Sequence, residues 1–205
     1  MIVVIDYGMC NLGSIVNMLR KVGAQPVVSA DPAVVEKAAK LVLPGVGAFD
    51  NGMKRLRESG LVGVLTRKVV DQRTPILGLC LGMQLFSRGS DEGVTPGLGW
   101  LDAETQRFKF PAGSDSLKIP HMGWNAVHIE RPNPLWTDMY EDPMFYFVHS
   151  YHVVCRDAAD VSASTEYGVT FTSSVARGNI LGTQFHPEKS HKFGMRLFAN
   201  FVGRF

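Results

Sequence analysis

The sequence is poor in cysteine, and the cysteines it has lie far apart. Among its 205 residues are three cysteines, Cys10, Cys80 and Cys155, and no CxxC pair. An odd number at wide spacing gives neither a disulfide framework nor the paired thiols of a structural zinc site. We therefore expect reduced thiols in a cytoplasmic protein, with no bound metal and no other cofactor.

Long apolar runs and clusters of basic residues are also missing. No stretch approaches the ~20 consecutive apolar residues that a membrane-spanning helix needs, and no basic segment followed by an apolar core marks a secretion signal. The formal net charge is only +2, and the Lys and Arg residues are scattered rather than grouped. We therefore expect neither a membrane nor a nucleic acid as a partner.

What is present suits an ordinary globular protein. Hydrophobic residues make up 45% of the sequence and charged residues 20%, values that allow a sizeable core. A chain of this length fits one domain, which we expect to span residues 1–205.

Strand-like and helix-like segments alternate in the first part of the chain. This alternation predicts an α/β fold with a mostly parallel central sheet and helices on both of its faces. From Trp100 onward strand-like segments dominate, which predicts added antiparallel strands in the C-terminal half. We expect strands at 2–5, 26–29, 41–43, 76–79, 100–108, 125–129, 145–154 and 170–185, the last interrupted by a hairpin turn at 177–179. We expect helices at 12–22, 51–57, 61–72 and 191–202, a short helix opened by Asp31 and Pro32, and a loop at 110–116.

The most informative motif surrounds Cys80. A strand-like run leads into this cysteine, a helix-like run leaves it, and Gly78 and Gly82 flank it at equal spacing. This is the nucleophile-elbow pattern with Cys in place of Ser, in which a sharp turn favours flanking residues without a Cβ. The N–H groups of the following helix would favour a thiolate. An isolated motif of this kind fits a buried core cysteine equally well, because free cysteine is often buried.

A histidine and a glutamate far along the chain make the catalytic interpretation stronger. His186 and Glu188 follow a strand-like run and are two residues apart, so in an extended segment they would face the same side. A carboxylate beside an imidazole can fix its tautomer and hold it toward a nucleophile. Together the motifs predict an acyl-transfer site with Cys80 as nucleophile, His186 as base and Glu188 as the residue that orients the imidazole.

These motifs resemble those of the class I (triad) glutamine amidotransferases, which have a flavodoxin-like fold. Four further segments are similar to the glutaminase subunits of imidazole glycerol phosphate synthases, at 5–9, 43–49, 120–125 and 147–151. The resemblance implies hydrolysis of L-glutamine to glutamate and ammonia through a thioester on Cys80. It also implies a heterodimer with a (β/α)₈-barrel cyclase, which uses the ammonia to make imidazole glycerol phosphate and an aminoimidazole carboxamide ribotide in histidine biosynthesis.

The oxyanion of the reaction needs two hydrogen-bond donors. The backbone N–H of Leu81 is one candidate, because it directly follows the nucleophile. The resemblance implies that the second comes from the peptide around Val46 and Gly47, in a glycine-containing segment that can approach a substrate closely.

The resemblance also implies how glutamine is held and where the partner binds. Gln84 and the backbone of Ser150 and Tyr151 would hold the α-amino and α-carboxylate groups, and Glu92 would pair with the ammonium. An exposed tryptophan in a loop-like stretch is typical of an interface, so we expect Trp124 to face the cyclase, together with Lys189.

Two alternatives stay open at this stage. One is a triad glutaminase that serves another synthase, such as the synthase that makes pyridoxal phosphate. The other is a non-catalytic interaction module that keeps the fold without the chemistry.

Overall fold

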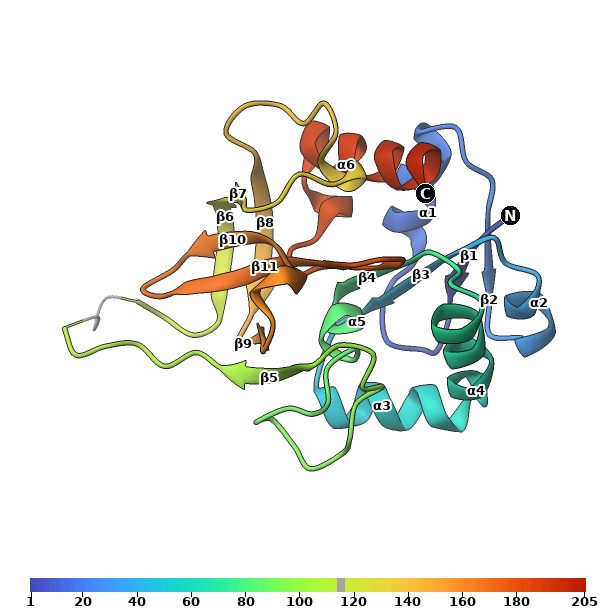
Figure 1. The fold of residues 1–205 in the computed structure, drawn as a ribbon, viewed down its shortest axis with the longest axis horizontal. Coiled ribbons are helices and arrows are strands. Elements are labelled where there is room, and N and C mark those ends of the chain that lie inside the picture. Colours follow the sequence, from blue (N-terminus) through green and yellow to red (C-terminus); the bar gives the residue numbers. More distant parts are fainter. Residues whose placement is uncertain (114–116) are drawn as a thin grey trace.

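The computed structural model describes residues 1–113 and 117–205 (Figure 1). The predicted loop at 110–116 therefore lies partly outside the described residues. Within the described ranges, every helix is too short or too polar to cross a lipid bilayer.

Five parallel strands form one half of a ten-stranded sheet (Figure 1). Their order is β2-β1-β3-β4-β12, so the last of them comes from the far end of the chain. The predicted α/β fold with a mostly parallel sheet is confirmed. The strands are β1 (Ile2–Ile5), β2 (Pro26–Ser29), β3 (Lys40–Gly45), β4 (Ile76–Cys80) and β12 (Ile180–Thr183).

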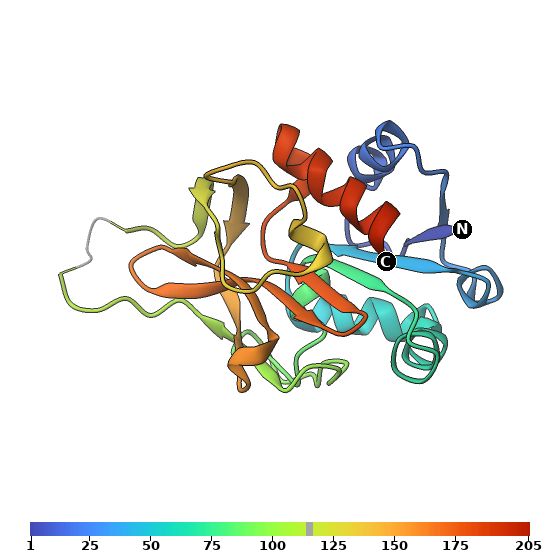
Figure 2. The ribbon, with the colours of Figure 1, turned by 45° about the horizontal axis from the view of Figure 1, so that its top comes forward.

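Helices cover both faces of this parallel half (Figures 1 and 2). α1 (Gly13–Lys21) and α6 (His191–Arg204) lie on one face. On the other face lie α2 (Pro32–Glu36), α3 (Phe49–Glu58) and α4 (Leu61–Thr66), which continues into a π-helical turn at Arg67–Asp71, and the short α5 (Leu81–Gln84) follows β4.

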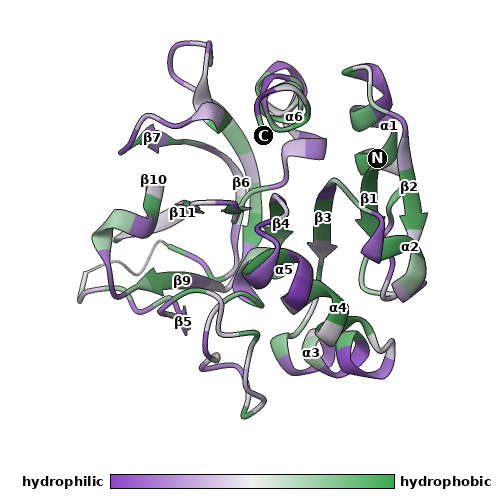
Figure 3. Ribbon diagram, turned by 45° about the vertical axis from the view of Figure 1, so that its right-hand side comes forward, coloured by the Kyte–Doolittle hydropathy of each residue, from purple (hydrophilic) through white to green (hydrophobic). Residues whose placement is uncertain are grey.

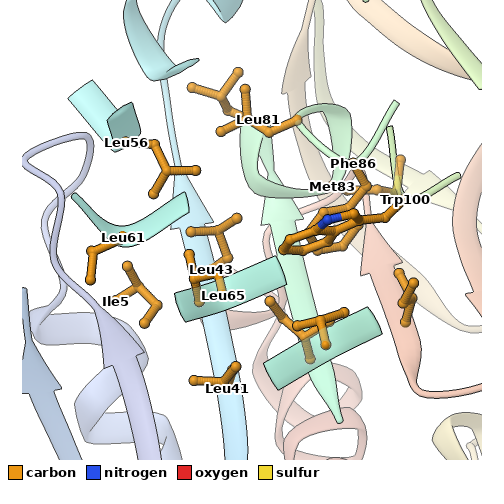
Figure 4. Packing of buried hydrophobic residues seen from close by; sticks show 14 of the residues in the cluster. Ile5, Leu41, Leu43, Leu56, Leu61, Leu65, Leu81, Met83, Phe86 and Trp100 are labelled. Atoms are coloured by element: carbon orange, nitrogen blue, oxygen red, sulfur yellow. The ribbon is translucent and has the colours of Figure 1, made fainter. Parts of the chain in front are cut away.

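The two faces have separate cores because neighbouring residues of a strand point to opposite sides. In β1, Val3 and Ile5 belong to the core under α3 and α4, part of which Figure 4 shows, whereas Val4 belongs to the core under α1 and α6. A strand buried on both sides must be apolar throughout. Figure 3 shows this for β1, while the outer surface of α3 is polar.

The antiparallel half extends away from the parallel strands, as Figures 1 and 2 show. In the main sheet β11 pairs with β12 and β10, β7 pairs with β10, and β9 joins β11 to β5, whereas β6 and β8 form a sheet of their own. The strands are β5 (Ala103–Arg107), β6 (His121–Ala126), β7 (His128–Ile129), β8 (Met144–His149), β9 (Tyr151–Cys155), β10 (Val161–Glu166) and β11 (Thr170–Arg177), with 3₁₀ turns at Pro134–Trp136, Ala158–Asp160 and Pro187–Lys189.

Several predicted boundaries were wrong in this half. The strand expected at 145–154 is two strands, because the chain changes partner from β6 to β5 at Ser150. Trp124 lies in β6 and not in a loop, since its backbone pairs with Tyr146. β10 was missed because its small polar residues show no apolar alternation. Two of its serines are buried, and they bond to polar groups of the 130–136 segment.

β3 also runs further than predicted, through Pro44 and Gly45. Gly45 pairs with Cys80 across β3 and β4, so the strand ends level with the predicted elbow. The turn after Gly45 therefore starts directly beside Cys80.

The start of α6 packs tightly on the segment before it. A Cβ on Gly194 would lie 1.8 Å from the carbonyl oxygen of Pro187, so only glycine fits this contact. Gly203, near the end of the same helix, has nothing within 4 Å of its Cβ position.

This pair gives a direct test of the packing. Gly194→Ala should lower the free energy of unfolding by about 1–3 kcal/mol or more, because backbone must move away from the new methyl group. Gly203→Ala should leave the stability equal or raise it by up to about 1 kcal/mol, since alanine is the better helix former. Urea unfolding measures both, and equal stabilities of the two variants would contradict the close contact.

Candidate active site

Cys80 ends β4 in a strained backbone conformation, with φ +52° and ψ −109°. Non-glycine residues rarely adopt such angles, and they concentrate at functional sites. Steric contacts explain the flanking glycines: a Cβ on Gly82 would lie 1.8 Å from the carbonyl oxygen of Leu43, and one on Gly78 would lie 2.6 Å from the ring of Phe86. The geometry is that of a nucleophile elbow.

His186 and Glu188 lie beside this elbow because β12 runs parallel to β4. Thr183 of β12 pairs with Leu79, so the chain beyond β12 continues next to Cys80. His186 is buried, and its Nδ1 donates to Oε1 of Glu188 at 2.8 Å. The route to this contact differs from the prediction, because Glu188 lies in a 3₁₀ turn and not in an extended segment.

The bond to Glu188 fixes the tautomer of His186. A carboxylate only accepts, so the proton lies on Nδ1 and Nε2 is left as the basic nitrogen. Nε2 is buried and has no hydrogen-bond partner among the described residues. An imidazole held in this way can take a proton from a nucleophile.

Charge around His186 favours its protonated form. Burial by itself would lower the pKa of His186, but interactions with the Cys80 thiol and the Glu188 carboxylate outweigh it and hold the pKa above its usual range. The site therefore stabilises an imidazolium, which a histidine becomes when it accepts the proton of a thiol.

One pocket of about 320 Å³ contains every residue predicted for the oxyanion and for substrate binding. It lies on the Cys80 side of the predicted triad. Its lining includes Val46, Gly47, Cys80, Leu81, Gln84, Glu92, His149, Ser150 and Tyr151.

A second pocket, of about 310 Å³, lies on the His186 side. Glu188, Lys189 and Cys10 line it, and Val46 lines both pockets. An open space therefore lies on each side of the predicted triad.

Hydrogen bonds set the positions of two predicted substrate residues. Nε2 of Gln84 donates to the carbonyl of Tyr151 and to Oε1 of Gln184, both at 3.0 Å. Oε2 of Glu92 accepts from the N–H of Phe49 at 2.8 Å. Gln84 therefore holds the Tyr151 peptide, and Glu92 is fixed at the start of α3.

Gln184 was not predicted as a site residue. Its Nε2 donates to Sγ of Cys80 at 3.6 Å, so it contacts the predicted nucleophile directly. The sequence carried a signal for it, since Gln184 is two residues before His186 and an alternating pattern would place both on one side.

His149 lines the pocket and holds the Tyr151 backbone in place. Its Nδ1 donates to the carbonyl of Tyr151 at 2.8 Å, and Nδ1 of His121 lies 3.1 Å from its Nε2. Burial lowers the pKa of His149 to about 3 and that of His121 to about 4, so both rings are neutral. Both nitrogens of His149 are used in hydrogen bonds, which leaves neither free to ligate a metal.

The N–H groups of Leu81 and Val46, both predicted to bind the oxyanion, have different surroundings in this structure. The N–H of Leu81 belongs to the first residue of the helix after Cys80. The N–H of Val46 donates to the carbonyl of Met9 at 2.9 Å and so is engaged with the loop after β1. Gly47 has φ +103°, a conformation that favours glycine.

Trp124 and Lys189 both lie next to Tyr146 at the surface, although they are far apart in the sequence. Trp124 is 44% exposed, and its ring is parallel to that of His191 at 5.4 Å between centroids. Nζ of Lys189 lies 5.6 Å from the ring centroid of Tyr146, which packs edge-on against Trp124. We call these four residues the Trp124 patch.

Comparison with known proteins gives a family match and close relatives along nearly the whole chain. The family model described as glutamine amidotransferase class-I matches residues 3–204. Imidazole glycerol phosphate synthase subunit HisH 2 of Methanococcus maripaludis is 52% identical over 202 residues, which cover 98% of each chain. The protein of the same name from Pseudomonas aeruginosa is 53% identical over 202 residues, again 98% of each chain.

Solved structures share the fold at low sequence identity. PurLQS from Thermotoga maritima has a TM-score of 0.73 at 18% identity, with 98% of this chain and 96% of that chain covered. A protein described as a glutamine amidotransferase has a TM-score of 0.71 at 20% identity, with 98% of each chain covered. With the family match and the close relatives, the conclusion is that the chain belongs to the class-I glutamine amidotransferase family.

Proposed function

We propose that this chain is the glutaminase subunit of an imidazole glycerol phosphate synthase and acts in the cytoplasm. Its close relatives are named imidazole glycerol phosphate synthase subunit HisH 2, and its three cysteines are free. The observation that carries the proposal is the buried His186–Glu188 hydrogen bond beside the strained Cys80. L-glutamine is the substrate, and glutamate and ammonia are the products.

Cys80 attacks the side-chain carboxamide carbon of glutamine. His186 takes the thiol proton and returns it to the departing nitrogen. The nitrogen leaves as ammonia, and the acyl group stays bound to Cys80 as a thioester. Water then attacks the thioester with His186 as base, and glutamate is released. Glu188 keeps Nδ1 of His186 protonated, so that Nε2 performs both transfers.

The pocket on the Cys80 side holds the rest of the substrate. The carboxylate of Glu92 binds the α-ammonium, and Gln84 with the Ser150–Tyr151 backbone holds the α-amino acid end. The hydrogen bonds from Gln84 and His149 to the Tyr151 carbonyl fix that backbone before substrate arrives. Preorganised contacts of this kind place the carboxamide close to Sγ.

Ammonia leaves by the pocket on the His186 side and passes to a (β/α)₈-barrel cyclase. Lys189 lines this pocket and also belongs to the Trp124 patch, so the exit lies next to the exposed aromatic surface. An exposed tryptophan with a neighbouring tyrosine and cation suits a protein interface. The Trp124 patch is therefore the proposed docking surface of the cyclase.

Binding of the cyclase also activates the oxyanion site. With the Val46 N–H bonded to Met9, this N–H is not available to the oxyanion. Rotation of the Gly45–Val46 peptide would break that bond and turn the N–H toward Cys80. The cyclase, with its nucleotide substrate bound, favours the rotated state, which makes it an allosteric activator.

The nucleophile can be tested by covalent labelling. A glutamine-analogue electrophile should label Cys80 and spare the other thiols, because burial, aided by nearby carboxylates, raises the pKa of Cys10 and of Cys155 to about 12 and keeps both protonated. Peptide mass spectrometry locates the adduct, and labelling mainly at Cys10 or Cys155 would refute the assignment. Cys80→Ala and Cys80→Ser should both lose glutamine hydrolysis while the cyclase still uses free ammonia.

The role of Glu188 can be tested with Glu188→Gln, which removes the charge but keeps the shape. Glutaminase kcat should fall by about 10²- to 10⁴-fold, the usual contribution of a general base. A near-normal rate for Glu188→Gln would mean that Glu188 does not orient His186.

Adding His186→Ala to Cys80→Ala should lower the glutaminase rate little further, because such residues act as one unit.

Stability should respond to pH in the Glu188→Gln variant. The interactions that raise the pKa of His186 also stabilise the folded protein. This stabilisation is fully present at pH values below 6.5, the ordinary pKa of histidine, and is lost as the pH rises through the pKa of about 10 in the folded protein. Glu188→Gln weakens it, so the difference in Tm from the wild type should be largest near about pH 6 and narrow toward about pH 10. Thermal unfolding across that range measures the trend, and a difference that widens with pH would contradict it.

Activation by the partner can be tested at the Trp124 patch. The glutaminase rate should rise steeply when the cyclase and its nucleotide are added together, and Trp124→Ala or Lys189→Ala should blunt this rise. Lys54→Ala is the matched control, because Lys54 is exposed on α3, away from the Trp124 patch. Equal rates for the subunit alone and for the liganded complex would exclude the switch and leave the triad assignment in place.

A further inference from the structure

The hydroxyl of Tyr7 is buried beside the active site and has no assigned role. Tyr7 follows β1 and is only 6% exposed. Among the described residues its oxygen has no hydrogen-bond partner, a status it shares with Nε2 of His186 and Oε2 of Glu188. A buried hydroxyl without a protein partner is costly to keep, so its position needs an explanation.

That position is against the peptide proposed to rotate. A Cβ on Gly45 would lie 2.4 Å from the Tyr7 oxygen and 3.1 Å from Cβ of Leu81. Gly45 is therefore enclosed between the Tyr7 hydroxyl and the first residue after the nucleophile. No other residue could occupy position 45 while Tyr7 keeps this place.

Tyr7 is a neutral donor here. Burial raises the pKa of its phenol far above the ordinary value, and the Cys10 and Cys80 thiols add to the effect. The hydroxyl therefore keeps its proton and can donate one hydrogen bond.

Rotation of the Gly45–Val46 peptide creates an acceptor that needs such a donor. At present the Val46 N–H faces the carbonyl of Met9, two residues after Tyr7. Rotation exchanges the N–H and C=O of the peptide, so the Gly45 carbonyl would turn to the side that the N–H has left. Two carbonyls would then face each other, an arrangement that is unfavourable unless a donor satisfies one of them.

We propose that the Tyr7 hydroxyl donates to the Gly45 carbonyl in the rotated state and so stabilises the arrangement that presents the Val46 N–H to the oxyanion. Tyr7 is thus a positioning residue for the oxyanion site. The inference rests on the proposed glutaminase function and its activation by the partner, and it adds the group that makes the active state reachable.

The test uses Tyr7→Phe, which removes one oxygen atom and keeps the ring. In the complex with the cyclase and its nucleotide, glutaminase kcat should fall by about three- to tenfold, the effect of losing one neutral hydrogen bond, with KM for glutamine unchanged. Tm of the isolated subunit should stay equal or rise, because the lost hydroxyl has no protein partner in the resting state. Ammonia-dependent synthesis by the cyclase should be unaffected.

Tyr167→Phe is the matched control. The hydroxyl of Tyr167 donates to the carbonyl of Lys118 at 2.8 Å, so its removal should lower Tm slightly and leave kcat unchanged. A structural role for Tyr7 would give this same pattern.

The outcomes separate the inference from the function on which it rests. A wild-type complex that its partner fails to stimulate would overturn the switch and the role of Tyr7 together. A stimulated wild type with an equally active Tyr7→Phe would overturn the Tyr7 inference alone, and so would a Tyr7→Phe variant whose Tm falls. Lower kcat at constant KM, with Tm equal or raised, supports it.

Discussion

The strained backbone at Cys80 is the constraint on which the site depends. A residue held at positive φ costs on the order of 1–3 kcal/mol and persists only when its surroundings leave no alternative. Here the surroundings are parallel strands on both sides, β3 and β12, and a helix that begins at the next residue. The approach of Gly82 to the Leu43 carbonyl leaves no room for a relaxed turn.

The same pairing of strands assembles the site from distant segments. Because β12 lies beside β4, the end of the chain returns to place Gln184, His186 and Glu188 around the thiol. β3 on the other side ends at Gly45, level with Cys80, and carries the Val46 peptide next to it. One register thus positions the proposed nucleophile, the proposed base and the proposed oxyanion segment relative to one another.

Sequence patterns predicted the parallel half well, because most residues of its strands are apolar and its helices have regular apolar stripes. The elbow and the proximity of His186 to Glu188 could also be predicted from the sequence, since each depends on short spacings along the chain. Polar β10 and the division at Ser150 were not, because both follow from which strands pair and not from local propensity. Nor could the sequence give the Val46–Met9 bond or the position of the Tyr7 hydroxyl, which depend on contacts between separate loops.

The two pockets on opposite sides of the triad bear on the order in which products depart. In the proposed reaction, the glutamyl group bound to Cys80 stays in the pocket with Ser150 and Tyr151, while ammonia is released on the side of Glu188 and Cys10. The acyl group bound to Cys80 then blocks the pocket with Ser150 and Tyr151 while ammonia leaves. Ammonia can depart while the thioester persists, and its backward loss to solvent is hindered until water completes the cycle.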